Sequence, residues 1–232
     1  MSKPCYFFFD FISPYAYLAW FRLQAFSPQI PRTHSIIPVP VVFAAFLNTY
    51  GHKGPAEIPP KRVYIFKDAA RTVHREGQAL GLPPLRSPPS HPFNPLLSLR
   101  VATVLLTPPE GVKGDTGVPY KVVGDMFKAV WGGGGGVENP DNVRKILDQA
   151  GLDSQGIMAQ AVTTENKELL RRNTDLSIKM GAFGVPTIVV DDEVFWGFDS
   201  LPNFESHMKG NKVNFAEALK EWNEVKPSAS RT

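Results

Sequence analysis

The chain is poor in cysteine: Cys5 is the single one among 232 residues. One cysteine cannot form an intramolecular disulfide, so a disulfide-stabilised scaffold and a Cys-X-X-Cys redox site are both excluded. A disulfide oxidoreductase relying on Cys5 alone is a poor alternative, because this thiol has no partner. We expect Cys5 to be buried and inert, and we expect the protein to work in a reducing compartment.

Other absences narrow the function further. The five histidines are scattered without the spacing of metal ligands, so no metal site is expected. The net charge of +3 comes without a dense run of lysine or arginine, which argues against nucleic-acid binding. No stretch is long and apolar enough to span a bilayer, and the aromatic patch at residues 6–9 does not read as a signal peptide.

The first 42 residues predict a strand, a helix and a second strand. Residues 5–11 are aromatic and apolar, which is typical of a buried strand. Ser13 and Pro14 suit the start of a helix over 14–26, because serine is a preferred N-cap and proline fits the first helical turn. Residues 33–42 predict the second strand, and the order favours a parallel α/β sheet.

The middle of the chain predicts helices separated by irregular segments rich in proline or glycine. The helices are expected at residues 61–80, 96–106, 120–131, 142–150 and 163–180, and the irregular segments at 82–95, 107–119 and 132–136. The five consecutive glycines at 132–136 favour a flexible loop over a phosphate-binding loop, because no Gly-Lys-Ser/Thr ending follows them.

The end of the chain returns to sheet. Residues 187–190 and 194–196 predict a hairpin that turns at Asp191 and Asp192, and a last amphipathic helix contains Leu219 and Trp222. The predicted fold class is α/β, with a thioredoxin-like core and an inserted all-helical domain. The thioredoxin-like domain is expected to comprise residues 1–45 and 165–232, and the helical insert residues 46–164.

Four segments of the sequence resemble the family of 2-hydroxychromene-2-carboxylate isomerases and kappa-class glutathione transferases. They occur in the family's order and span nearly the whole chain: Phe-Asp-Phe-Ile-Ser-Pro-Tyr-Ala-Tyr-Leu-Ala at 9–19, Pro-Pro-Lys-Arg at 59–62 with Asp68 and Arg71, Gly-Ala-Phe-Gly-Val-Pro-Thr at 181–187, and Phe-Trp-Gly-Phe-Asp at 195–199. The resemblance implies a DsbA-like fold, bound glutathione as the thiol donor and, often, a homodimer. Kappa-like relatives occur in mitochondria and peroxisomes, which makes both alternatives to a cytoplasmic location.

Ser13 matches the catalytic serine of that family. A hydroxyl at a helix N-terminus can donate a hydrogen bond to a thiolate, and the positive helix end adds about 0.3–1 kcal/mol of anion stabilisation. Because thiolates are the nucleophiles, such a site raises the reactive fraction of a bound thiol. The alternative is that Ser13 only caps the helix, and the two roles can coexist.

The resemblance also implies the residues that bind glutathione. Val185 would offer its backbone to the cysteinyl part, with Pro186 in the cis form. Asp199 and Ser200 match the place where the γ-glutamyl end is held, and an acidic group there can pair with the α-ammonium. Lys61 can meet a carboxylate. Each assignment has an alternative. Val185 can be an ordinary loop residue, Asp199 and Ser200 can be a helix cap with a surface carboxylate, and Lys61 can be a solvated lysine on a helix face.

One position departs from the family pattern. Where the family commonly has an asparagine after a glycine, this chain has Gly51 followed by His52. His52 can replace the amide's hydrogen bond to glutathione, act as a base, or lie at the surface. The segments 107–119 and 132–136 are also atypical, and loops of this kind would shape the pocket for the electrophile.

Three functions follow from these observations. In a kappa-like transferase, the thiolate attacks a small electrophile. In a glutathione-dependent isomerase, the thiolate adds reversibly to a conjugated double bond, the resulting single bond rotates, and elimination returns the thiol. The third is a redox-inactive thioredoxin-fold binding protein. The opening motif at residues 9–19 favours the isomerase branch, whereas His52 and the atypical loops point away from a standard aromatic-degradation enzyme.

Overall fold

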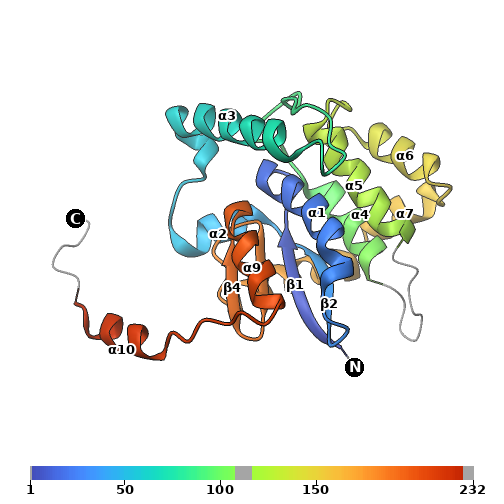
Figure 1. Ribbon diagram of the computed structural model, residues 1–232. Coiled ribbons are helices and arrows are strands. Elements are labelled where there is room, and N and C mark those ends of the chain that lie inside the picture. The colour runs from blue at the N-terminus through green and yellow to red at the C-terminus, as the bar shows by residue number, and fades with distance from the viewer. Residues whose placement is uncertain (1, 108–116, 227–232) are drawn as a thin grey trace.

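A computed structural model describes residues 2–107 and 117–226 (Figure 1). Its described strands form one mixed sheet in the order β2-β1-β3-β4. β1 (Lys3–Phe9) pairs in parallel with β2 (His34–Pro40) and antiparallel with β3 (Thr187–Val190). β4 (Glu193–Trp196) completes the hairpin with β3. The α/β fold class, the parallel opening and the C-terminal hairpin are therefore confirmed.

The first strand ends at Phe9 and not at Phe11 as predicted. The reason is Asp10, whose carboxylate Oδ1 accepts a hydrogen bond from the Ile12 backbone N–H at 3.0 Å. This local bond turns the chain before α1 begins. Phe11 lies after this turn and is buried there, which explains why an aromatic residue follows the end of the strand.

The predicted helices are present, with ends shifted by a few residues. They are α1 (Pro14–Phe26), α3 (Pro59–Glu76), α4 (Leu96–Leu106), α5 (Gly117–Trp131), α6 (Pro140–Gln149), α8 (Thr164–Lys179) and α10 (Ala216–Glu224). Residues 82–95 and 132–136 are irregular, as expected. Of the predicted loop at 107–119, residues 108–116 lie outside the described part of the chain, and α5 takes in the last three.

Three helices of eight residues each were not predicted. They are α2 (Phe43–Tyr50), α7 (Ser154–Ala161) and α9 (Leu201–Met208). Two helical turns contain too few apolar repeats to reveal a period of 3.6 residues. The helix that directly follows the hairpin is α9, which buries Leu201 and Phe204 in the core, and the predicted last helix with Leu219 and Trp222 comes after it as α10.

The side chains of β1 alternate between two cores. Phe7 and Phe9 face α1 and α5, where the Phe9 ring lies 5.4 Å from Trp20 and 5.6 Å from Phe127. Phe8 points the other way, into a smaller cluster of buried residues that includes Phe46 of α2. Both faces of the sheet are therefore covered, and Figure 1 shows α3 lying across the end where β1 leads into α1.

Cys5 is fully buried in the first of these cores and forms no disulfide. Burial, with a smaller contribution from the charge of Asp191, raises the pKa of this thiol to about 11. The thiol therefore stays protonated near neutral pH, as a structural cysteine does.

The inserted helices occupy the middle of the chain, as the fold class requires. The division at residues 45/46 and 164/165 stays a prediction, and its first boundary falls inside α2. Within residues 2–107 and 117–226, no helix is long and apolar enough to cross a membrane.

Candidate active site

The site is built around the start of α1. Ser13 is the N-cap of this helix, and its Oγ accepts a hydrogen bond from the Ala16 N–H at 3.2 Å. The same hydroxyl donates to the backbone carbonyl of Val185, with an oxygen–oxygen distance of 3.4 Å. Two residues that are 172 positions apart in the sequence therefore meet at the helix N-terminus.

The segment that approaches Ser13 is held by a cis peptide bond between Val185 and Pro186, as expected. The carbonyl of Pro186 accepts a hydrogen bond from the Gly197 N–H at 2.9 Å. Gly197 has a φ of 87°, which favours glycine, and it opens the turn that carries residues 198–200. The sequence motifs at 181–187 and 195–199 are thus joined directly.

Asp199 and Ser200 lie in that turn, η3 (Phe198–Ser200). The Ser200 hydroxyl donates to the carbonyl of Gly197 at 2.9 Å, whereas the Asp199 side chain is exposed. The charge of Asp199 contributes weakly to raising the pKa of Tyr15 in the first turn of α1. The structure therefore brings Asp199 to the same end of α1 as Ser13.

Lys61 and His52 are both exposed and are linked to the site less directly. Lys61 is exposed in the first turn of α3, and no hydrogen bond or ion pair among the described residues links it to the other predicted site residues. The His52 ring stacks on Tyr50 with ring centres 6.4 Å apart, and the Tyr50 hydroxyl donates to the carbonyl of Ala182 at 3.0 Å. His52 is therefore connected to the segment that contains the cis-proline, through an aromatic neighbour.

Asp10 lies beneath the site and is almost completely buried. Besides the bond to Ile12, its Oδ2 accepts from the Phe43 N–H at 2.9 Å, at the start of α2. Burial raises the pKa of this carboxyl to about 7, against the two backbone hydrogen bonds, which lower it. One carboxyl group thus fixes both the turn before Ser13 and the start of a helix on the opposite face.

The turn before Ser13 is also held by residues from the middle of the chain. The Nε1–H of Trp131 donates to the carbonyl of Phe11 at 2.9 Å, and His91 Nε2 lies 3.1 Å from the carbonyl of Ile12. A hydrogen bond to that carbonyl requires the proton on Nε2. Burial lowers the pKa of His91. The charge of Arg62 acts in the same direction and the bond to Ile12 opposes it, so the net effect favours the neutral ring.

Trp131→Phe is expected to destabilise the protein by about 1–3 kcal/mol more than Trp20→Phe, because it leaves the buried carbonyl of Phe11 without its donor. Trp20 is a matched control: it lies in the same core, and its Nε1 has no hydrogen-bond partner among the described residues. Chemical denaturation of both variants measures the difference. Equal losses would show that the bond adds nothing beyond ring volume.

A second polar link ties the site to α3. The Tyr15 hydroxyl donates to Asp68 Oδ2 at 2.7 Å. Burial, followed by the hydrogen bond and charge of Asp68, raises the pKa of the Tyr15 phenol well above its usual value. Tyr15 therefore stays protonated and acts as a hydrogen-bond donor that holds α3 against the start of α1.

Tyr15→Phe is expected to cost about 1–2 kcal/mol, as the loss of a hydrogen bond to a carboxylate in a half-buried place. Tyr17→Phe is the control, because the Tyr17 hydroxyl is buried and has no partner among the described residues. We expect the free energy of unfolding of the control to equal that of the wild type or to be slightly higher. A loss in the control as large as that of Tyr15→Phe would contradict the role of Asp68.

Asp10, Tyr15, His91 and Trp131 were not assigned roles from the sequence. Asp10, Tyr15 and Asp68 belong to the segments that resemble the family, and this membership could have identified them from the sequence. His91 and Trp131 carried no such signal, because their contacts with the turn span 79 and 120 residues.

Comparisons with known proteins agree with the fold. A family model described as the DSBA-like thioredoxin domain matches residues 6–209. The 2-hydroxychromene-2-carboxylate isomerase of Pseudomonas sp. (strain C18) is 29% identical to this chain, in an alignment that covers 90% of this chain and 91% of the isomerase. Glutathione S-transferase kappa 1 of Homo sapiens is 23% identical, in an alignment that covers 88% of this chain and 90% of the transferase. A solved 2-hydroxychromene-2-carboxylate isomerase superposes with a TM-score of 0.74 at 22% identity, over 96% of this chain and all of that one.

Proposed function

Because the chain belongs to the family of DSBA-like thioredoxin domains, we propose that it is a glutathione-dependent enzyme in which Ser13 stabilises the thiolate of bound glutathione for attack on a small electrophile. The observation that carries the proposal is the contact between the Ser13 hydroxyl and the carbonyl of Val185. It unites the helix start and the cis-proline segment, the two landmarks of thioredoxin chemistry, at a place where the chain has no cysteine. The thiol must then come from a ligand.

The hydroxyl of Ser13 is suited to serve a thiolate. Its bond to Val185 is long at 3.4 Å and therefore weak, so the proton can turn toward a sulfur at little cost. The bond that it accepts from Ala16 N–H stays in place and polarises the hydroxyl, which makes it a better donor. The N-terminus of α1 adds a positive field at the same point.

The remaining predicted residues form the proposed binding site for glutathione. Val185 offers its backbone N–H and carbonyl to the cysteinyl part. Asp199 accepts the α-ammonium of the γ-glutamyl end, with Ser200 beside it. Lys61 meets a carboxylate of the peptide, and His52 contributes a hydrogen bond. The homodimeric state and a cytoplasmic location belong to the same proposal.

In the transferase reaction, the sulfur forms a bond to an electrophilic carbon and the leaving group departs with its electron pair. Glutathione is consumed in this case. The second candidate, a glutathione-dependent isomerase, is favoured by the isomerases among the relatives, at 29% and 24% identity. There the sulfur adds to a conjugated carbon–carbon double bond, the new single bond rotates, and elimination regenerates the thiol.

Titration calorimetry with reduced glutathione tests the shared part of the proposal. We expect the wild type to bind it, with S-methylglutathione binding more weakly because it cannot form the thiolate. A wild-type protein that binds neither would contradict the proposal and leave a redox-inactive thioredoxin-fold binding protein. Counting thiols during turnover then separates the two reactions, because conjugation consumes one thiol for each product and isomerisation consumes none.

A further inference from the structure

The peptide group between Ile12 and Ser13 is held at both of its ends. Its carbonyl oxygen accepts a hydrogen bond from His91 Nε2 at 3.1 Å, and its N–H donates to the backbone carbonyl of Asp10 at 3.2 Å. A peptide group is planar, so fixing its C=O and its N–H fixes the plane. The Cα of Ser13 lies in this plane, and the two hydrogen bonds therefore set where the side chain of Ser13 begins.

The dihedral angles of Ser13 itself then place its hydroxyl. Ser13 has φ −96° and ψ 119°, the extended conformation of a helix N-cap. The helix holds the hydroxyl from the other side, because Ser13 Oγ accepts from the Ala16 N–H at 3.2 Å. The position of this hydroxyl thus depends on the first turn of α1 and on the peptide group that His91 holds.

Two side chains from the middle of the chain reach the turn before Ser13 through hydrogen bonds. Trp131 donates to the carbonyl of Phe11, one peptide group before the one that His91 holds. The N–H of the Ser13 peptide group is bonded within the turn, to Asp10. His91 therefore supplies the contact from outside the turn that acts on the peptide group of Ser13 itself.

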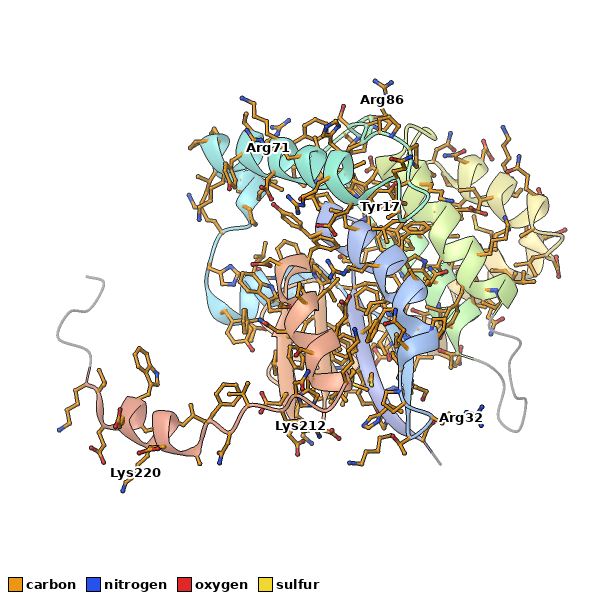
Figure 2. The ribbon with its side chains drawn as sticks, viewed as in Figure 1. Tyr17, Arg32, Arg71, Arg86, Lys212 and Lys220 are labelled. Atoms are coloured by element: carbon orange, nitrogen blue, oxygen red, sulfur yellow. The ribbon has the colours of Figure 1, made fainter. Side chains whose placement is uncertain are left out.

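The His91 ring is held in place by aromatic neighbours. It packs edge-to-face on Trp131, with ring centres 5.5 Å apart, and on Phe93, with ring centres 6.3 Å apart. The carbonyl of Trp131 also accepts from the Arg86 N–H at 2.8 Å, which fixes the start of the segment that carries His91. Figure 2 shows Arg86 at the end of the molecule where α3 lies.

The backbone on either side of His91 is anchored to a single carboxylate. The hydroxyl of Ser90 and the backbone N–H of Asn94 donate to the two oxygens of Glu138, the second at 3.0 Å. Side chains that are fixed by packing and by outer hydrogen bonds hold their partners in one geometry. His91 is therefore a preset donor and not a mobile surface histidine.

We propose that His91 is a positioning residue, whose Nε2–H orients the Ile12–Ser13 peptide group so that the Ser13 hydroxyl meets the thiolate of bound glutathione. This inference rests on the proposed function and assigns to His91 a role that acts through the backbone. Without the bond from His91, the peptide group can rotate and the hydroxyl moves with it. A displacement of about 1 Å near the reacting atoms can lower a rate by about 10²-fold.

Two amide substitutions separate the Nε2 donor from the rest of the ring. The amide nitrogen of glutamine is as many bonds from Cβ as the imidazole Nε2, whereas that of asparagine is one bond closer, like Nδ1. His91→Gln can therefore keep an N–H donor for the carbonyl of Ile12, and His91→Asn cannot. We expect His91→Asn to lower kcat/KM for glutathione with an electrophile by about 10–100-fold and to raise the pKa of the bound thiol, while His91→Gln keeps values close to those of the wild type.

The same measurements contain the results that would overturn the proposal. Wild-type kcat/KM in both variants would show that the bond to Ile12 is not needed. Equal losses in both would show that the imidazole serves in another way, for example as a base. Thr163→Ala, which removes the cap of α8, controls for lost stability, and a loss of kcat/KM in this control as large as in His91→Asn would also count against the proposal.

Hydrogen exchange of the protein without glutathione separates this inference from the proposed function. The N–H groups of Ser13 and Ala16 report on the turn and on the cap. We expect both to exchange about five-fold faster in His91→Asn, as for the loss of one hydrogen bond, and at the wild-type rate in His91→Gln. Equal exchange in all three proteins would overturn the role of His91, whether or not glutathione binds. The expected exchange rates in a protein that binds no glutathione would uphold the positioning of Ser13 by His91 and contradict the proposed function.

Discussion

Replacing Ser13 with alanine is expected to lower kcat/KM for glutathione with an electrophile by about 10²–10³-fold, the usual cost of removing one donor aimed at a developing or bound anion. The physical reason is that the hydroxyl at the N-cap of α1 is the proposed donor to the thiolate. The ultraviolet absorbance of the bound thiolate, followed against pH, should show a higher thiol pKa in the variant. Ser13→Thr keeps a hydroxyl and should retain more activity.

The control must separate chemistry from helix capping. Ser13→Ala also removes an N-cap, which costs about 1 kcal/mol of stability. Thr163→Ala removes the corresponding cap of α8, where the threonine hydroxyl accepts from the Asn166 N–H at 3.3 Å. We expect this variant to lose similar stability with unchanged kcat/KM. A Ser13→Ala enzyme with wild-type kcat/KM and an unchanged thiol pKa would contradict the proposed role.

Asp10→Ala is expected to destabilise the fold by about 2–6 kcal/mol, because two partly buried N–H groups lose their acceptor at about 1–3 kcal/mol each. Those groups belong to Ile12 and Phe43, so the turn before Ser13 and the start of α2 should loosen together. Denaturant unfolding measures the stability, and hydrogen exchange of the two amides measures the loosening. Unchanged exchange at both amides would contradict this role of Asp10.

The ionisation of Asp10 adds a pH dependence with a definite sign. Its pKa is about 7 in the folded protein, above the ordinary value of 3.8. Between these values the folded state holds a proton that the unfolded state has lost. The contribution of Asp10 to stability is therefore full below about pH 4 and declines by up to about 1.4 kcal/mol per pH unit as the pH rises toward 7.

Asp10→Asn is the variant that isolates this effect, because the amide has a similar shape and does not ionise. The difference in unfolding free energy between wild type and Asp10→Asn should decrease from pH 4 to pH 7 and stay constant above pH 7. Chemical denaturation at several pH values gives this difference directly. A difference that does not change across this range would show that the carboxyl titrates as an ordinary exposed one.

The sequence by itself determined the strands, the longer helices and the cap of the first helix. Ser13 and Pro14 identify an N-cap and a first helical turn through local steric and hydrogen-bonding preferences, and the structure confirms both. Long amphipathic helices such as α3 and α8 repeat their apolar residues often enough to be recognised. The lone Cys5 excluded a dithiol site without any coordinates.

Only the tertiary structure decided which residues meet. The contacts of Ser13 with Val185, and of Trp131 and His91 with the turn before Ser13, join parts of the chain 79 to 172 residues apart, and no local pattern encodes such pairings. The structure likewise decided the place of Leu219 and Trp222. Their periodicity predicts a helix correctly. Periodicity cannot tell whether the apolar face of that helix packs on its own sheet or stays exposed to solvent. The outcome depends on which other side chains already cover the sheet.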